Sequence, residues 1–160
     1  QPNTAPKTRR DRSRFIFDVR NDSRAFWHRK KAMSLRIVRL GTPRHPDEGT
    51  RIGTVRRPPR GVPKAEFSSQ DWYDVWFPNL APSVETMKLG QEAASPSQWA
   101  AFARRYKAEM AAPHAQHDLE LLAVLSQTTN VSVGCYCEVE ARCHRSILRQ
   151  LLIDAGARIV

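Results

Sequence analysis

Short apolar runs, each followed closely by glycine or proline, succeed one another in the first half of the chain from Met33 onward. Runs of this length that are rich in β-branched and aromatic side chains are typical of strands. Three strands are predicted here, at residues 35–40, 51–55 and 72–77. The intervening segments 41–49 and 56–64 each contain glycine and two or three prolines, so they are predicted to be loops.

The rest of the chain carries apolar residues at the 3.6-residue spacing of helices. The clearest case is 95–112, where Ser95 is the predicted N-cap and Pro96 the first helical residue. Further elements are predicted in chain order: a helix after Ser83, a helix at 117–127, a strand at 131–137, a helix at 144–155 and a strand from 158. This order predicts an α/β fold, with a small, at least partly parallel sheet, helices packed on it, and a βαβ unit at the C-terminal end.

The positive charge of the chain is unevenly distributed. The 160 residues fit one domain and carry a net charge of +10. Residues 1–32 hold ten Lys or Arg against three Asp, so +7 of this charge precedes Met33. We interpret 1–32 as a flexible basic N-terminal extension and 33–160 as the α/β domain. The extension is a candidate for binding nucleic acid, and the alternative is an appendage without a role.

The sequence also argues against several classes of protein. No segment has the apolar length of a membrane span, and the N-terminal segment lacks the apolar stretch of a secretory signal. Three clustered cysteines do not suit a secreted disulfide framework, so we expect a reducing cytoplasm. We assign no cofactor and no membrane partner, and the sequence does not indicate an oligomeric state.

All three cysteines lie within nine positions of the segment 132–146 (SVGCYCEVEARCHRS). Cys135 and Cys137 are two residues apart on a predicted strand, so they face the same side at its C-terminal end, where α/β sheets hold ligands. Cys143 and His144 stand at the predicted start of the next helix, whose free N–H groups favour anions. The pattern indicates an anion pocket with activated thiols, and these four residues are the candidate catalytic groups.

Two other interpretations of the cysteines stay open. The spacing C-x-C-x5-C-H offers four zinc ligands but matches no common zinc motif, and we expect His144 to point away from Cys143 at a helix start. We therefore assign no metal and keep a structural zinc site as the alternative. The cysteines are otherwise interpreted as small buried apolar residues. The spacing fits neither a phosphatase loop nor a C-x-x-C redox pair.

A second candidate site is the arginine turn, residues 55–62 (VRRPPRGV). Its prolines stiffen the backbone, and Gly61 permits a conformation that other residues resist. Arg56, Arg57 and Arg60 are therefore held in a rigid frame and lose less freedom when they bind an anion. Arg145, which follows the cysteines, adds a planar fork of donors. The predicted anion-binding residues are Arg56, Arg60, Gly61 and Arg145. The alternative for the arginines is solvated surface charge.

Four segments together resemble the domain-of-unknown-function family DUF488, in or near its YeaO-like branch. They are RIGTVRRPPRGVPK, FPNLAPS, WAAFARRYKAEM and VGCYCEVEARCHRSILRQLL. The resemblance spans about residues 35–157, and its most specific elements are the Arg60–Gly61 turn and Cys135 with Cys143–Arg145. The resemblance implies a compact α/β fold, without an established reaction.

The leading functional hypothesis joins the two candidate sites. If the strands at 51–55 and 131–137 are neighbours, the arginine turn and the cysteines open on one crevice. The protein is then a small α/β protein with a Cys/His/Arg anion pocket, whose partner is a nucleotide or phosphorylated metabolite that it binds or acts on. The alternatives are a nucleic-acid-binding module that uses 1–32 and a structural zinc site at the cysteines. Whether the protein is an enzyme is left open.

Overall fold

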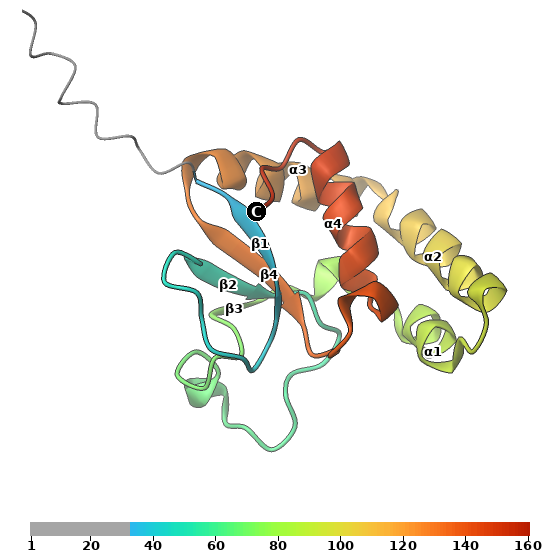
Figure 1. The fold of residues 1–160 in the computed structure, drawn as a ribbon, viewed down its shortest axis with the longest axis horizontal. Coiled ribbons are helices and arrows are strands. Elements are labelled where there is room, and N and C mark those ends of the chain that lie inside the picture. Colours follow the sequence, from blue (N-terminus) through green and yellow to red (C-terminus); the bar gives the residue numbers. More distant parts are fainter. Residues whose placement is uncertain (1–32) are drawn as a thin grey trace, which may run out of the picture. The chain divides into compact units, whose positions relative to one another are not determined.

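The computed structural model describes residues 33–160, and the predicted basic extension at 1–32 lies outside them. The described chain forms a four-stranded sheet in the order β1-β4-β2-β3, with every pair parallel (Figure 1). The strands are β1 (Leu35–Arg39), β2 (Thr50–Gly53), β3 (Val75–Trp76) and β4 (Val131–Cys135). The predicted α/β class with a parallel sheet is therefore confirmed.

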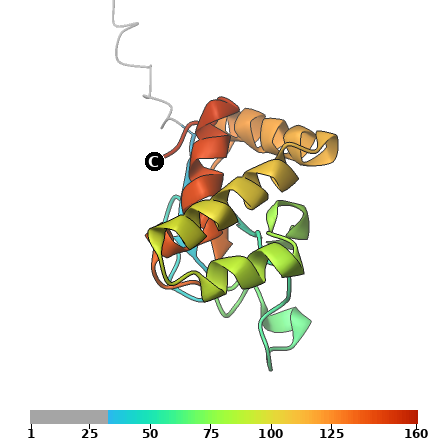
Figure 2. The ribbon, with the colours of Figure 1, turned by 90° about the vertical axis from the view of Figure 1, so that its right-hand side faces the viewer.

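Four α-helices gather on one side of this sheet (Figures 1 and 2). They are α1 (Val84–Glu92), α2 (Pro96–Met110), α3 (Pro113–Thr128) and α4 (His144–Asp154). The main core lies between the two layers and consists largely of Leu35, Ile52, Val131 and Val133 from the strands and Phe102, Tyr106, Leu119, Leu122, Ile147, Leu148 and Leu152 from the helices. None of these four helices is long and apolar enough to cross a membrane.

The helix starts follow the predicted caps. The hydroxyl of Ser83 accepts a hydrogen bond from the backbone N–H of Thr86, and Ser95 forms a capping box with Gln98 ahead of Pro96. The third helix starts at Pro113 rather than at residue 117. Proline is favoured in the first turn of a helix because its missing N–H has no partner to lose there.

Several predicted strands are shorter than expected, and β4 ends at Cys135 rather than at residue 137. The segment 72–77 pairs with β2 only at Val75–Trp76, since the backbone N–H of Trp72 donates instead to the carbonyl of Phe67. The segment after α4 meets the sheet at one parallel bridge, between Ile159 and Leu35, rather than as a strand. The chain after β4 therefore has the order of a βαβ unit, but its last β element is a single bridge.

A buried ion pair fastens the loop before β2 to the sheet. Arg51 and Glu48 are both almost fully buried, and the Arg51 guanidinium donates through Nε and Nη2 to the Glu48 carboxylate. Ser132 of β4 donates its hydroxyl to the same carboxylate at 2.7 Å. Arg51 also donates to the carbonyl oxygens of Thr42 and Asp71. These contacts hold the loops that carry Thr42, Glu48 and Asp71 against β2 and β4.

The adjacency on which the functional hypothesis depends is present. Strands β2 and β4 are parallel neighbours, with Gly53 opposite Gly134. Because the strands are parallel, their carboxyl ends lie at the same edge. The arginine turn follows β2, and the segment with Cys137 and Cys143 follows β4, so both leave the sheet from that edge.

Candidate functional site

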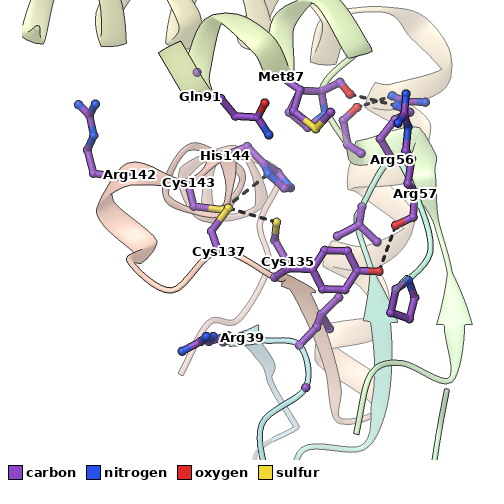
Figure 3. Close-up of a pocket in the computed structure, with 18 of the residues that line it drawn as sticks. Arg39, Arg56, Arg57, Met87, Gln91, Cys135, Cys137, Arg142, Cys143 and His144 are labelled. Atoms are coloured by element: carbon purple, nitrogen blue, oxygen red, sulfur yellow. Dashed lines mark hydrogen bonds between the residues drawn. The ribbon is translucent and has the colours of Figure 1, made fainter. Parts of the chain in front are cut away.

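A cavity of about 710 Å³ opens at the carboxyl ends of β1, β4 and β2 (Figure 3). Its walls are the arginine turn, the segment from Cys135 to His144, and parts of α1 and α2. Of residues 33–160, five arginines and no Asp or Glu line the cavity; the arginines are Arg39, Arg56, Arg57, Arg60 and Arg142. The rest of the lining is mostly apolar or aromatic, including Trp72, Met87, Trp99, Phe102 and Tyr136.

The cysteine cluster (Cys135, Cys137 and Cys143) lies on the wall of this cavity. The three thiols are free, and their sulfur atoms all lie within 4.8 Å of one another. Cys135 and Cys143 are buried, whereas Cys137 is exposed. The Sγ atoms of Cys135 and Cys137 are 3.7 Å apart. Three soft sulfur ligands at this spacing could hold a metal ion.

The chain returns Cys143 to the end of β4 through one tight turn. The 3₁₀ turn η3 (Glu140–Arg142) follows β4, and Cys143 is the N-cap of α4. The Cys143 sulfur accepts a hydrogen bond from the backbone N–H of Arg145 at 3.5 Å. Arg142 holds the turn against the α1–α2 connection, since it donates to the carbonyl of Ala93 and lies over the Trp99 ring.

His144 is buried beside the cysteine cluster. Its Nε2 lies 2.9 Å from the carbonyl oxygen of Thr54, and because a carbonyl only accepts, Nε2 must carry the ring proton. In the neutral ring Nδ1 is then an acceptor, and it lies 3.7 Å from the Cys143 sulfur. The expectation that His144 points away from Cys143 is therefore wrong. Cys143 has extended backbone angles as the N-cap, and this folds its side chain back over the first helical turn.

Hydrogen bonding shifts the pKa values of the three thiols in different directions. The hydrogen bond that Cys135 donates to Cys137 is the main cause that raises the pKa of Cys135 and lowers that of Cys137. The nearby Arg145 guanidinium lowers the pKa of Cys137 further. Hydrogen bonding with Cys135 is the main cause that lowers the pKa of Cys143, and the neighbouring His144 lowers it further. Negative charge is therefore most stable on Cys137, the one exposed thiol of the cluster.

The predicted anion-binding residues are only partly brought together. Arg56 and Arg60 line the cavity, whereas Gly61 and Arg145 do not. Gly61 has a φ of 73°, which fits its predicted role in the turn backbone. Arg145 is buried and donates to the carbonyl oxygen of Cys137 at 2.6 Å, so it stabilises the backbone that carries Cys137.

The arginines of the cavity differ in how far they are already engaged. Arg56 donates to the carbonyl oxygens of Pro82 and Ala81, at 3.0 and 2.6 Å. Arg57 and Arg60 are exposed, and no side-chain hydrogen bond or ion pair is recorded for either within residues 33–160. The carbonyl of Arg57 accepts a hydrogen bond from the hydroxyl of Tyr136 at 3.0 Å. This bond ties the arginine turn to the segment that carries Cys135 and Cys137.

Three of the cavity arginines were not among the predicted anion ligands. Arg39 is the last residue of β1 and lies at the same edge of the sheet. Its position at the end of a largely apolar strand is a signal that was present in the sequence. Arg57 lies within the arginine turn itself. Arg142 reaches the cavity because η3 turns the chain back, and no local sequence pattern predicts that turn.

Comparison with known proteins gives one match. The family description DUF488-N3a, the active DUF488-N3 subclade, matches residues 35–156, which is most of the chain. No curated protein and no solved structure matches. The match does not address the YeaO-like branch, which stays a prediction. With a match of this length on a fold that carries the Arg-Gly turn and the Cys…Cys-His-Arg element in one place, the chain belongs to the DUF488 family.

Proposed function

We propose that this protein binds a small anionic molecule, a nucleotide or a phosphorylated metabolite, in the cavity and acts on it with the cysteine cluster. The observation that carries the proposal is the charge of the cavity wall, to which the described part of the chain contributes five arginines and no carboxylate. Guanidinium groups suit phosphate because their planar donors match its oxygens. The volume of about 710 Å³ lies within the range of roughly 300–1,000 Å³ that is usual for small-molecule sites.

The arginine turn supplies the donors that are available to a ligand. Arg57 and Arg60 are exposed on the proline-stiffened turn, so they can contact an anion without first breaking a recorded contact. Arg56 already donates to two carbonyl groups and mainly fixes the wall. Trp72 and Tyr136 give the cavity an aromatic side, which suits the flat or apolar part of a nucleotide.

Cys137 is the group that reaches a bound ligand. It is the exposed member of the cysteine cluster and lies on the cavity wall. Its sulfur is the proposed nucleophile, Cys135 donates a hydrogen bond to it, and His144 positions Cys143 beside it. The matched subclade is described as active, which supports a reaction rather than binding alone.

Binding measurements by calorimetry test the proposal. The probes are nucleoside monophosphates and sugar phosphates, each beside its dephosphorylated counterpart. The double substitution Arg57→Ala/Arg60→Ala should weaken phosphate binding at least about tenfold, since each lost charge-assisted hydrogen bond costs about 1.5–3 kcal/mol. The control is Arg104→Ala/Arg105→Ala, which removes the same charge from the exposed surface of α2.

The two sets of variants separate a built site from general attraction to a basic protein. Phosphate-dependent binding that survives in the α2 control and is lost in the turn variant supports the proposal. Equal losses in both variants would overturn it, as would equal binding of the phosphorylated and dephosphorylated probes.

A further inference from the structure

We propose that Cys135, Cys137 and Cys143 form a binding site for one Zn²⁺ ion, whose fourth coordination position faces the cavity, and that the bound ion reversibly lowers the reactivity of Cys137. Metal binding is a property of the cluster alone and does not require the cavity to bind an anion. The lowered reactivity of Cys137 concerns the residue to which the proposed function assigns attack.

The spacing of the sulfur atoms fits a tetrahedral ion. Zinc–sulfur bonds are about 2.3 Å long, which places two sulfur ligands of a tetrahedron about 3.8 Å apart. The Sγ atoms of Cys135 and Cys137 are 3.7 Å apart, and all three lie within 4.8 Å. Small side-chain rotations therefore suffice to bring all three sulfurs onto one ion.

The cluster supplies three ligands from the protein and no acidic oxygen. Thiolates favour soft ions such as Zn²⁺ over Mg²⁺ or Ca²⁺. Three protein ligands leave a fourth position, as in zinc sites that exchange their remaining ligand. Because all three cysteines line the cavity, this position is open to water or to an anion held by the arginines.

The surroundings balance the charge of such a complex. Three thiolates and one Zn²⁺ carry one net negative charge, and the Arg145 guanidinium is buried next to Cys137, to whose carbonyl it donates. The Nε atom of Arg145 is buried and has no hydrogen-bond partner among the described residues. A buried cation with an unused donor is costly unless a negative group lies nearby. A metal–thiolate complex provides that negative charge.

The contacts of Cys143 suit a metal-bound thiolate. Its sulfur accepts the backbone N–H of Arg145 at 3.5 Å, and the Nδ1 atom of His144 lies 3.7 Å away on the other side. The Cys143 proton passes to solvent when the metal binds. The hydrogen bond from Nε2 to Thr54 fixes the His144 ring beside Cys143.

Zinc binding changes the reactivity of the Cys137 sulfur. Zn²⁺ replaces the remaining thiol protons, which pass to solvent, and no electron is transferred. Coordination draws charge away from the Cys137 sulfur and crowds it, so the sulfur attacks more slowly. A chelator that removes Zn²⁺ restores the free thiolate, so the change is reversible.

Co²⁺ and Zn²⁺ titrations of the full chain test the site. We expect one Co²⁺ per chain with the absorption typical of thiolate-to-cobalt charge transfer, displaced by one equivalent of Zn²⁺. Zn²⁺ should also slow alkylation of Cys137 by iodoacetamide, and EDTA should restore the rate. Cys137→Ser should weaken metal binding by more than the roughly 10–100-fold that the loss of an outer-shell partner costs. Cys137 is exposed, so this variant is expected to fold, which circular dichroism checks.

Two controls make the result specific. His114→Ala/His117→Ala removes an exposed histidine pair from α3 and should leave the cobalt spectrum unchanged. Arg57→Ala/Arg60→Ala should also bind metal normally, so that failure of the anion site and failure of the metal site are told apart. The proposal is overturned if the thiolate absorption does not form, if Cys137→Ser binds metal as tightly as the parent chain, or if Zn²⁺ leaves alkylation unchanged.

Discussion

The Nε2 atom of His144 lies 2.9 Å from the carbonyl oxygen of Thr54, so one hydrogen bond joins the start of α4 to the residue that follows β2. Both residues are buried, and Thr54 is fully inaccessible. A buried carbonyl without a partner costs about 1–3 kcal/mol. We therefore predict that His144→Phe, which keeps a ring in place, lowers the free energy of unfolding by about that amount in urea titrations.

His114→Phe on the exposed surface of α3 is the matched control for this prediction. It replaces the same residue type where no buried carbonyl depends on it, and we expect a change within about 0.5 kcal/mol. Equal effects at the two positions would show that the bond between His144 and Thr54 contributes nothing measurable.

Cys137 should be the first cysteine to be alkylated in the metal-free native protein. It is exposed, while Cys135 and Cys143 are buried. Hydrogen bonding from Cys135 and the charge of Arg145 lower the pKa of Cys137, so its thiolate persists at pH values below the usual thiol pKa of about 8.5. In EDTA, mass spectrometry should show one modification whose rate stays nearly constant as the pH is lowered from about 8.5 toward neutrality.

The other two thiols provide the internal reference. They should be modified only in urea, where the chain unfolds. A Cys137 rate that falls about tenfold per pH unit below pH 8.5 would contradict the lowered pKa. Early modification of Cys135 or Cys143 in the native protein would contradict the burial that distinguishes them.

Elements with a strong local signal were predictable from the sequence. Ser95 and Pro96 mark the start of α2, and Ser83 marks the start of α1, because capping depends on residues a few positions apart. Cys135 lies at the end of a strand as predicted, but β4 ends there, so Cys137 lies just after the strand rather than on it. The pairing of β2 with β4 could only be stated as a condition, since parallel neighbours are set by the whole chain.

Features that depend on distant contacts were not predictable. No local pattern marks Arg51 for burial, yet it is fully buried because Glu48, Thr42 and Asp71 all accept its donors. Arg145 was predicted to be an anion ligand, yet it is buried, donates to the Cys137 carbonyl and does not line the cavity. In both cases the direction of a long side chain follows from partners that no local pattern specifies.

Asp74 should make the protein more sensitive to acid. Burial acts to raise its pKa, but hydrogen bonds from Arg44, Ser68 and the backbone N–H of Arg51 outweigh burial and lower the pKa from 3.8 to about 2. A lowered folded-state pKa stabilises the protein above pH 3.8, and this stabilisation is lost as the pH falls toward 2. Asp74→Asn should cost roughly 1 kcal/mol at pH 7, after allowance for its partial exposure.

The difference between Asp74→Asn and the parent chain should shrink as the pH falls from about 4 to 2, which urea titrations at several pH values would measure. Glu120→Gln is the control, since Glu120 is exposed on α3 and makes no hydrogen bond or ion pair with residues 33–160. A constant difference across this pH range would mean that the Asp74 charge is not the cause.

Arg51 and Glu48 should be strongly coupled, because each is buried with the other as its counter-ion. Arg51→Leu leaves the Glu48 carboxylate buried without its cation, and such losses cost about 3–5 kcal/mol. Glu48→Leu/Arg51→Leu removes both charges, so it should be much less destabilised than the sum of the single variants. The exposed pair of Lys88 and Glu92 on α1 serves as control, with an expected coupling below about 0.5 kcal/mol. Additive losses at positions 48 and 51 would mean that their burial, and not their pairing, holds the loop to the sheet.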